Sequence, residues 1–186
     1  MAAPPTSRWP VAVATTALVL VALLAVQNRS LRADLEELRY HSVRPSAGEF
    51  VPSFRGVTLS GDTIRVVTGQ PDASQVLVMF TTTCPSSRAS IPAWNELADL
   101  LAKRGSALIG IVLDSKESVR ERSRTWGLRF PVVEFPDEPT RRMYRGGWVP
   151  ATIVVDGEGG IVHVRMGLLE DPFHVDSILK AATAPI

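Results

Sequence analysis

The sequence has very few of the side chains that bind metals or form covalent cross-links. Its 186 residues include one cysteine, Cys84, and three scattered histidines, His41, His163 and His174. A single cysteine excludes an internal disulfide framework, and the histidines lack the spacing of zinc ligands. We therefore expect no metal site and assign no cofactor.

An excess of charge of one sign is also missing. Lysine and arginine number 20 against 19 aspartates and glutamates, which gives a net charge of +1 with no basic cluster. A protein that binds nucleic acid needs a positive footprint for the phosphates, so we expect no nucleic-acid partner. The length and the 45% hydrophobic composition leave room for one globular domain and an appendage.

One long apolar run without charge covers residues 9–26, after a short N-terminal tail of residues 1–8. As a helix it would span roughly 27 Å, close to the apolar thickness of a bilayer. We interpret it as an uncleaved transmembrane anchor (a signal-anchor), with a cleaved signal peptide and a buried core helix as the alternatives. A signal peptide has a shorter apolar region that ends in small residues, whereas this run ends at Val26.

Residues 27–48 are expected to form a juxtamembrane helix followed by a hinge. Leucines recur every seven residues between positions 24 and 38, so a homodimer through residues 24–38 is one interpretation. Two heptads are few for a stable zipper, and a solvated helix is the alternative. We place the globular domain at residues 49–186.

Strand and helix patterns alternate along this domain. Strands are expected over residues 63–68, 75–80, 107–113, 130–133, 152–155 and 161–165, and helices over residues 86–103, 116–126, 140–145 and 172–182. The glycine-rich turn before the last strand indicates an antiparallel hairpin. The pattern predicts an α/β fold with a mixed sheet that is covered on both faces.

Cys84 follows the apolar strand at residues 75–80 and directly precedes Pro85. Proline suits the first turn of a helix, so Cys84 is expected at a helix N-terminus. Unpaired N–H groups there favour a thiolate over a thiol, and we predict a lowered pKa for Cys84. Arg88, one turn later, would add to this effect if its side chain folds back.

Three segments together resemble the redoxin branch of the thioredoxin-like superfamily, which includes TlpA-like membrane-anchored thiol-disulfide oxidoreductases and AhpC/TSA peroxiredoxins. They are residues 50–64, residues 80–88 (FTTTCPSSR) and residues 147–157 (GWVPATIVVDG), in the order that the family has. The resemblance implies a thioredoxin-like fold with a central mixed sheet flanked by helices. It also implies that Cys84 is the nucleophile and that Pro150 is a cis-proline that faces it.

The sequence departs from this family at informative positions. Ser87 replaces the resolving cysteine, so the chain alone should not complete dithiol-disulfide exchange. Thr83 stands where tryptophan is common, and Val78 stands where thioredoxin has a buried acid. The peroxiredoxin motif is only partly present, because Leu77 replaces its proline, and Arg145 is the one conceivable counterpart of its arginine.

The resulting assignments fall into two groups. The candidate catalytic residues are Cys84, Pro85, Ser87 and Pro150, and the candidate substrate-binding residues are Thr81, Thr83, Arg88, Trp148 and Val149. Packing is the alternative role for Trp148. Asp114 is expected to cap the helix that follows it, and residues 120–124 to form a solvated helix face.

These assignments predict a membrane-anchored, thioredoxin-like redox protein. Its single nucleophilic cysteine would exchange disulfides with a partner protein or a small thiol. One alternative is a non-catalytic binding module at the membrane, in which Cys84 is a small apolar residue of a retired site, and another is a one-cysteine thiol peroxidase. A redox domain on one anchor favours an extracytoplasmic location, whereas the arginines that follow the apolar run favour the cytoplasm.

Overall fold

The structure, a computed structural model, describes residues 9–70, 73–114 and 116–184. It divides into two compact units, residues 1–41 and 42–186. The first unit contains nearly all of α1 (Trp9–Ser42), which is one continuous helix. Within α1, Val13–Glu36 is long and apolar enough to cross a membrane by length and composition, with a mean hydropathy of 1.4. This candidate span overlaps the anchor expected at residues 9–26 and extends beyond it.

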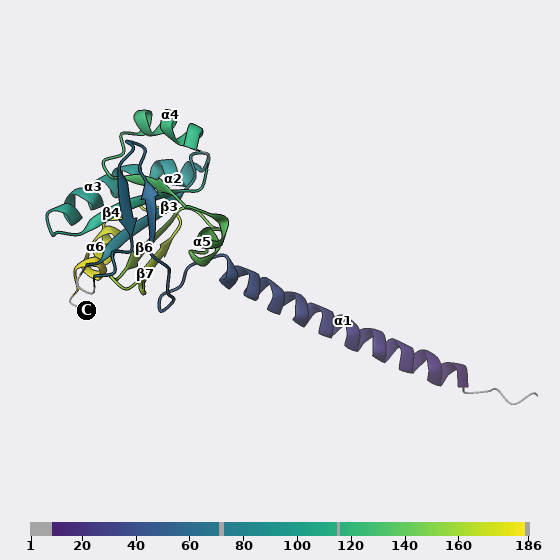
Figure 1. The fold of residues 1–186 in the computed structure, drawn as a ribbon. Helices are drawn as coiled ribbons and strands as arrows, with labels where there is room; N and C mark the ends of the chain where they lie inside the picture. Colours follow the sequence, from purple (N-terminus) through teal and green to yellow (C-terminus); the bar gives the residue numbers. More distant parts are fainter. Residues whose placement is uncertain (1–8, 71–72, 115, 185–186) are drawn as a thin grey trace, which may run out of the picture. The chain divides into compact units, whose positions relative to one another are not determined.

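The second unit is an α/β domain (Figure 1). Its strands are β1 (Phe54–Val57), β2 (Thr63–Val66), β3 (Gln75–Phe80), β4 (Ala107–Val112), β5 (Val132–Glu134), β6 (Ala151–Val155) and β7 (Ile161–Met166). Its helices are α2 (Pro85–Ala89), α3 (Ile91–Ala102), α4 (Lys116–Trp126), α5 (Glu138–Met143) and α6 (Pro172–Thr183).

The main sheet has the strand order β5-β4-β3-β6-β7, with β3, β4 and β5 parallel and with β6 and β7 each antiparallel to its neighbour. All six residues of β3 are buried, which explains why this strand reads as an unbroken apolar run. The expected mixed sheet and the terminal antiparallel hairpin are therefore confirmed.

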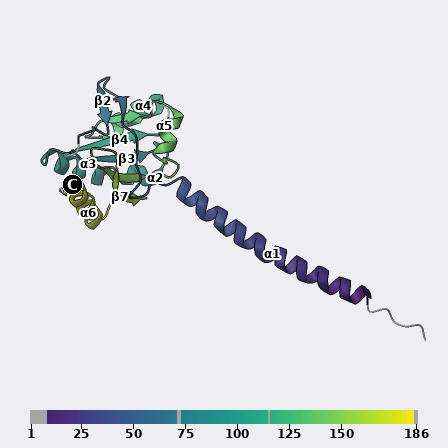
Figure 2. The same ribbon diagram turned by 60° about the horizontal axis from the view of Figure 1, so that its bottom comes forward.

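Each face of the main sheet carries its own apolar core. Val76, Val78 and Phe80 of β3 face a cluster formed with α3 and α6, which lie side by side in Figures 1 and 2. Leu77 and Met79 face the opposite cluster, which includes residues of the β1–β2 hairpin. The alternation along one strand thus buries both faces.

The helix expected at residues 86–103 is in fact two helices, because α2 ends before Ser90 and α3 begins after it. Pro92 in the first turn of α3 has no N–H to donate to the carbonyl of Arg88, which favours a break in the helix at this point. Ser90 stabilises the break, since its hydroxyl donates to Ser86 O and accepts from Leu169 N, both at 2.9 Å. The short α2 that results is the helix that begins at Pro85.

The compact domain begins at Ser42 rather than at Glu49. The segment expected as a hinge is bound to the domain, because Pro45 is buried and Gly48 N donates to Ile161 O at 2.8 Å. A Cβ added at Gly147 would meet Val43 at 2.9 Å, so this segment runs against the loop that precedes β6. Strand β1 was also missed by the sequence patterns, and it pairs with β2.

A buried hydrogen bond joins α3 to β6, because Trp94 Nε1 donates to Thr152 Oγ1 at 3.2 Å. Thr152→Val leaves the indole N–H buried without an acceptor, which we expect to cost about 1–3 kcal/mol of unfolding free energy. Adding Trp94→Phe removes the orphaned donor, so the double variant should lose less than the sum of the two single variants. Urea unfolding of the 42–186 unit measures all four proteins, and strictly additive losses would contradict this role for the pair.

Candidate active site

Strand pairing brings three chain segments to one edge of the sheet. Parallel β3 and β4 end together, with Phe80 opposite Val112. Antiparallel β6 begins at the same edge, with Ala151 opposite Met79. Cys84 follows β3, Asp114 follows β4 and Pro150 precedes β6, so residues far apart in the sequence become neighbours.

Cys84 occupies the N-cap position of α2, and Pro85 stands in the first turn, as the sequence predicts. The cysteine has an extended backbone and a partly exposed side chain. Its Sγ donates to the carbonyl of Val149 at 3.9 Å, and the Val149–Pro150 peptide bond is cis. The thiol therefore faces the loop that leads into β6.

Ser87, at the position of the missing resolving cysteine, lies under this thiol. Its side chain is fully buried, and its Oγ interacts with the Cys84 sulfur at a geometry looser than that of an ordinary hydrogen bond. Partial burial raises the pKa of the Cys84 thiol, but hydrogen bonds from Ser87 Oγ, from the N–H groups of Ser87 and Ser86, and from Ser86 Oγ more than offset it. The pKa of Cys84 consequently lies below its ordinary value, as the sequence predicts.

A cavity of about 540 Å³ opens beside Cys84. It is lined by Thr82, Thr83, Cys84, Pro85, Arg88, Ala89 and Arg122. Arg88 is exposed and is not among the groups that lower the pKa of the thiol, so its side chain does not fold back toward the sulfur. It lines the cavity instead.

Two residues that sequence reasoning placed elsewhere build the wall of this cavity. Asp114 Oδ2 accepts from Thr82 N and from Thr82 Oγ1, each at 2.5 Å, so it holds the loop before Cys84, and its expected cap of α4 stays a prediction because it involves residues 115–118, which lie outside the fully described part of the chain. Arg122 Nη1 donates to Thr82 O at 2.8 Å, so Arg122 is not simply part of a solvated helix face. The sequence contains one signal of this role. Arg122 follows Val119 by three residues, which places it on the same side of α4 as a residue that is buried against the domain.

The other candidate residues divide between the site and its surroundings. Thr83 is exposed and lines the cavity, whereas Thr81 is partly buried and does not line it. Trp148 is 48% exposed, and the Arg44 guanidinium lies 4.0 Å from the centre of its ring. Arg145 pairs with Glu49 at 2.9 Å and does not line the cavity, which removes it as the counterpart of a peroxidase arginine.

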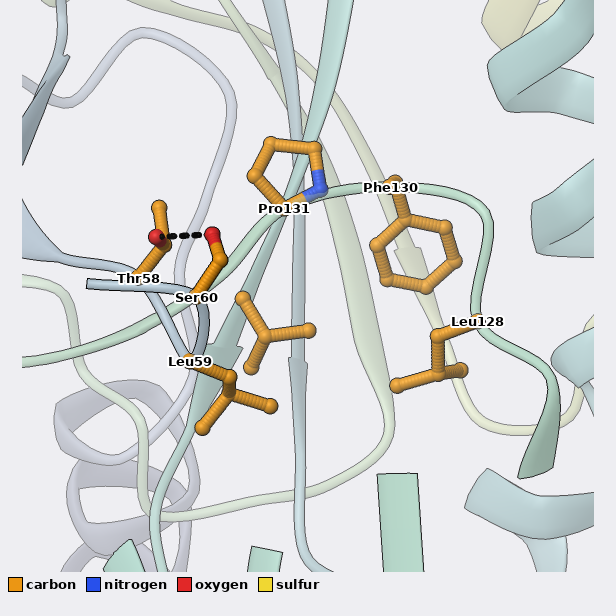
Figure 3. Close-up of a pocket in the computed structure, with 7 residues that line it drawn as sticks. Thr58, Leu59, Ser60, Leu128, Phe130 and Pro131 are labelled. Carbon is orange, nitrogen blue, oxygen red and sulfur yellow. Dashed lines mark hydrogen bonds between the residues drawn. The ribbon is translucent and has the colours of Figure 1, made fainter. Parts of the chain in front are cut away.

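A second hollow, of about 240 Å³, lies between the β1–β2 connection and the segment that leads into β5 (Figure 3). It is lined by Thr58, Leu59, Ser60, Leu128, Phe130, Pro131 and Val132. Its polar side chains already bond to each other, since Thr58 Oγ1 and Ser60 Oγ are 2.8 Å apart. Without a titratable side chain in its lining, this hollow offers no acid, base or nucleophile. Among the described residues, no three His, Cys, Asp or Glu side chains gather as a metal site would require.

Sequence comparisons place the chain among known proteins. Residues 47–164 match the sequence profile of the AhpC/TSA family. The thiol-disulfide oxidoreductase ResA of Geobacillus kaustophilus (strain HTA426) is 29% identical over 101 residues, which make up 52% of this chain and 58% of that protein. The chain thus matches less than two thirds of that relative's length.

Solved structures show the same fold. A thiol:disulfide interchange protein of the thioredoxin family from Chlorobium tepidum TLS superposes with a TM-score of 0.61 and 25% identity, covering 75% of this chain and 99% of that one. StoA from Bacillus subtilis gives a TM-score of 0.60 at 16% identity, with 74% and 98% covered. Peroxidoxin BcpB from Mycobacterium tuberculosis gives 0.59 at 17%, with 73% and 95% covered. The expected thioredoxin-like fold is confirmed.

The hydroxyl of Ser87 is expected to help hold Cys84 as a thiolate. Ser87→Ala removes the first of the hydrogen bonds that lower the pKa of Cys84, so that pKa should rise. Ser86→Ala is the matched control, because its hydroxyl lowers the same pKa less. The pH dependence of iodoacetamide alkylation measures both shifts. A larger rise in Ser86→Ala than in Ser87→Ala would contradict the assignment.

Proposed function

Because this chain belongs to the AhpC/TSA family, we propose that it is a membrane-anchored thiol-disulfide exchange protein with Cys84 as its single nucleophile. The observation that carries the proposal is the setting of the thiol. Cys84 is partly exposed, opens onto a cavity and has a pKa below its ordinary value. A retired cysteine would need none of these properties.

The first step of the exchange forms a mixed disulfide. The Cys84 thiolate attacks one sulfur of a partner disulfide, the partner's S–S bond breaks, and its second sulfur leaves as a thiolate. The N–H groups of Ser86 and Ser87 stabilise the attacking thiolate before this step and the departing one when it reverses.

The loop before β6 holds the partner beside the sulfur. Pro150 is buried and its carbonyl is already used by Gly167 N at 2.8 Å, so the loop is fixed in place. The N–H of Val149 donates to no acceptor in the described part of the chain, and it is free to pair with an extended partner segment. Trp148 and Thr83 are both exposed and add surface that the same partner can contact.

Ser87 determines how the reaction ends. A hydroxyl does not displace a sulfur from a disulfide, so the mixed disulfide persists until an external thiol attacks it. That thiolate bonds to the partner's sulfur, and Cys84 leaves as a thiolate. The names of the relatives, a thiol-disulfide oxidoreductase and a thiol:disulfide interchange protein, agree with this class of reaction.

The proposal predicts a trapped intermediate. With a neutral probe, bis-hydroxyethyl disulfide, the full chain in detergent should accumulate a mixed disulfide at Cys84 that mass spectrometry detects. Ser87→Cys should convert that adduct into an internal disulfide and so lower its yield, and Cys84→Ser is the blank. A wild-type chain that forms no adduct would favour a non-catalytic binding module, and one that reacts with hydrogen peroxide far faster than with disulfides would favour a peroxidase.

We place the domain on the extracytoplasmic side of the membrane, held there by α1. A membrane-impermeant maleimide should then label Cys84 in intact cells, after brief treatment with a thiol that removes any mixed disulfide. Arg29→Gln and Arg32→Gln test the opposing pull of the arginines after the apolar run. Labelling only after lysis would contradict this topology and place the domain in the cytoplasm. A dimer through residues 24–38 stays a prediction, which cross-linking of α1 in membranes would test.

A further inference from the structure

The cavity beside Cys84 has a cationic rim that disulfide exchange alone does not require. Arg88 of α2 and Arg122 of α4 both line it with exposed side chains. No aspartate or glutamate lines it, and neither arginine takes part in an ion pair within the described residues. In a chain with a net charge of +1, two cations at one hollow with no ion-pair partner among the described residues are a local excess of positive charge.

Arg122 is held in position at this rim. Its Nη1 donates to Thr82 O, and Thr82 is fixed in turn by the carboxylate of Asp114. The Asp114 oxygen accepts both Thr82 donors, and Asp114 does not line the cavity. A guanidinium has five N–H donors, so most of those of Arg122 stay available to a carboxylate or a phosphate.

Ser87 acts on the sulfur and not on the cavity. It is fully buried and is not among the residues that line the cavity, and its hydroxyl interacts with the Cys84 sulfur. Besides the Cys84 thiolate, the charged groups that an incoming molecule would meet in the cavity are therefore the two arginines.

We propose that the group carried on Cys84 during exchange is a small anionic thiol, whose carboxylate or phosphate is bound by Arg88 and Arg122. This inference rests on the proposed function of Cys84. The cavity volume of about 540 Å³ suits a small molecule rather than a folded partner. The same rim would also attract an acidic peptide. Comparing a small anionic disulfide with an acidic peptide disulfide distinguishes these two ligands.

The proposed cycle balances without any other oxidant or reductant. The Cys84 thiolate attacks one sulfur of the small disulfide, a mixed disulfide forms on Cys84, and one small thiolate leaves. A second thiolate then attacks the small thiol's sulfur on Cys84, a new disulfide leaves, and Cys84 returns as a thiolate. During the intermediate, the anionic group lies against the two guanidinium groups.

The test compares three small disulfides on the full chain in non-ionic detergent: dithiodiglycolate, which is anionic, bis-hydroxyethyl disulfide, which is neutral, and cystamine, which is cationic. Each rate of adduct formation is divided by the rate with a neutral model thiol, N-acetylcysteine amide. We expect the wild-type chain to prefer the anionic probe over the cationic one by at least about tenfold at low salt. The preference should shrink as ionic strength rises.

Replacing the arginines should remove this preference between the probes. Arg88→Gln and Arg122→Gln should each lower the ratio about threefold, and the double variant should bring it close to one. The ratio compares the rates of the anionic and the cationic probe on the same protein at the same pH. A substitution that changes the fraction of Cys84 present as thiolate changes both rates equally and leaves the ratio unaffected. Arg55→Gln, on β1 away from the cavity lining, removes the same charge and should leave the ratio unchanged. The Arg88 side chain makes no hydrogen bond in the described part of the chain, and only its backbone N–H and carbonyl are paired, so its variant stays informative if Arg122→Gln fails to fold.

Four outcomes would count against the proposals. If all three probes react equally well, the anionic thiol is overturned and the exchange function stands. If the anion preference persists in the double arginine variant, the rim is not its source and the inference is overturned as well. If no probe reacts with Cys84, the exchange function itself fails. A short acidic peptide disulfide that outcompetes dithiodiglycolate on the wild-type chain would overturn the small-molecule assignment.

Discussion

Strand β3 pairs in parallel with β4 and antiparallel with β6, and the site depends on that arrangement. It brings the end of β3, the end of β4 and the start of β6 to one edge of the sheet, where Cys84, Asp114 and Pro150 follow or precede those strands. The buried bond from Trp94 to Thr152 then ties α3 to β6, so the elements on either side of the thiol are held together. The geometry of the site is thus set by the sheet rather than by the loops that carry its residues.

The pKa of the Cys84 thiol results from two opposing effects, burial and hydrogen bonding. Partial burial disfavours the charged form of Cys84, whereas the donors of Ser86 and Ser87 favour it and prevail. Ser87 therefore keeps part of the role of the residue it replaces, because its hydroxyl stabilises a thiolate, and it loses the other part, because it cannot resolve a mixed disulfide. The arginines at the cavity suggest what takes over the second part: a small anionic thiol that arrives from solution.

Local patterns in the sequence were enough to predict the strands and helices whose formation depends mainly on neighbouring residues. The buried run at residues 75–80 and the helix at residues 116–126 agree with β3 and α4, since strand burial and helix boundaries depend on nearby residues. Features that depend on distant partners were missed. Arg122 meets Thr82 across forty positions, and β1 is stabilised by pairing with β2 and not by its own short pattern. The break at Ser90 was predictable from Pro92, but the helical periodicity of the apolar residues concealed it.

The central claim is that Cys84 is a working nucleophile, and the pH dependence of its alkylation by iodoacetamide in the full chain tests it most directly. The account predicts fast labelling with an apparent pKa clearly below the value of about 8.5 for an unperturbed cysteine. Slow labelling with a pKa at or above that value would contradict it, and would leave a redox fold that serves for binding.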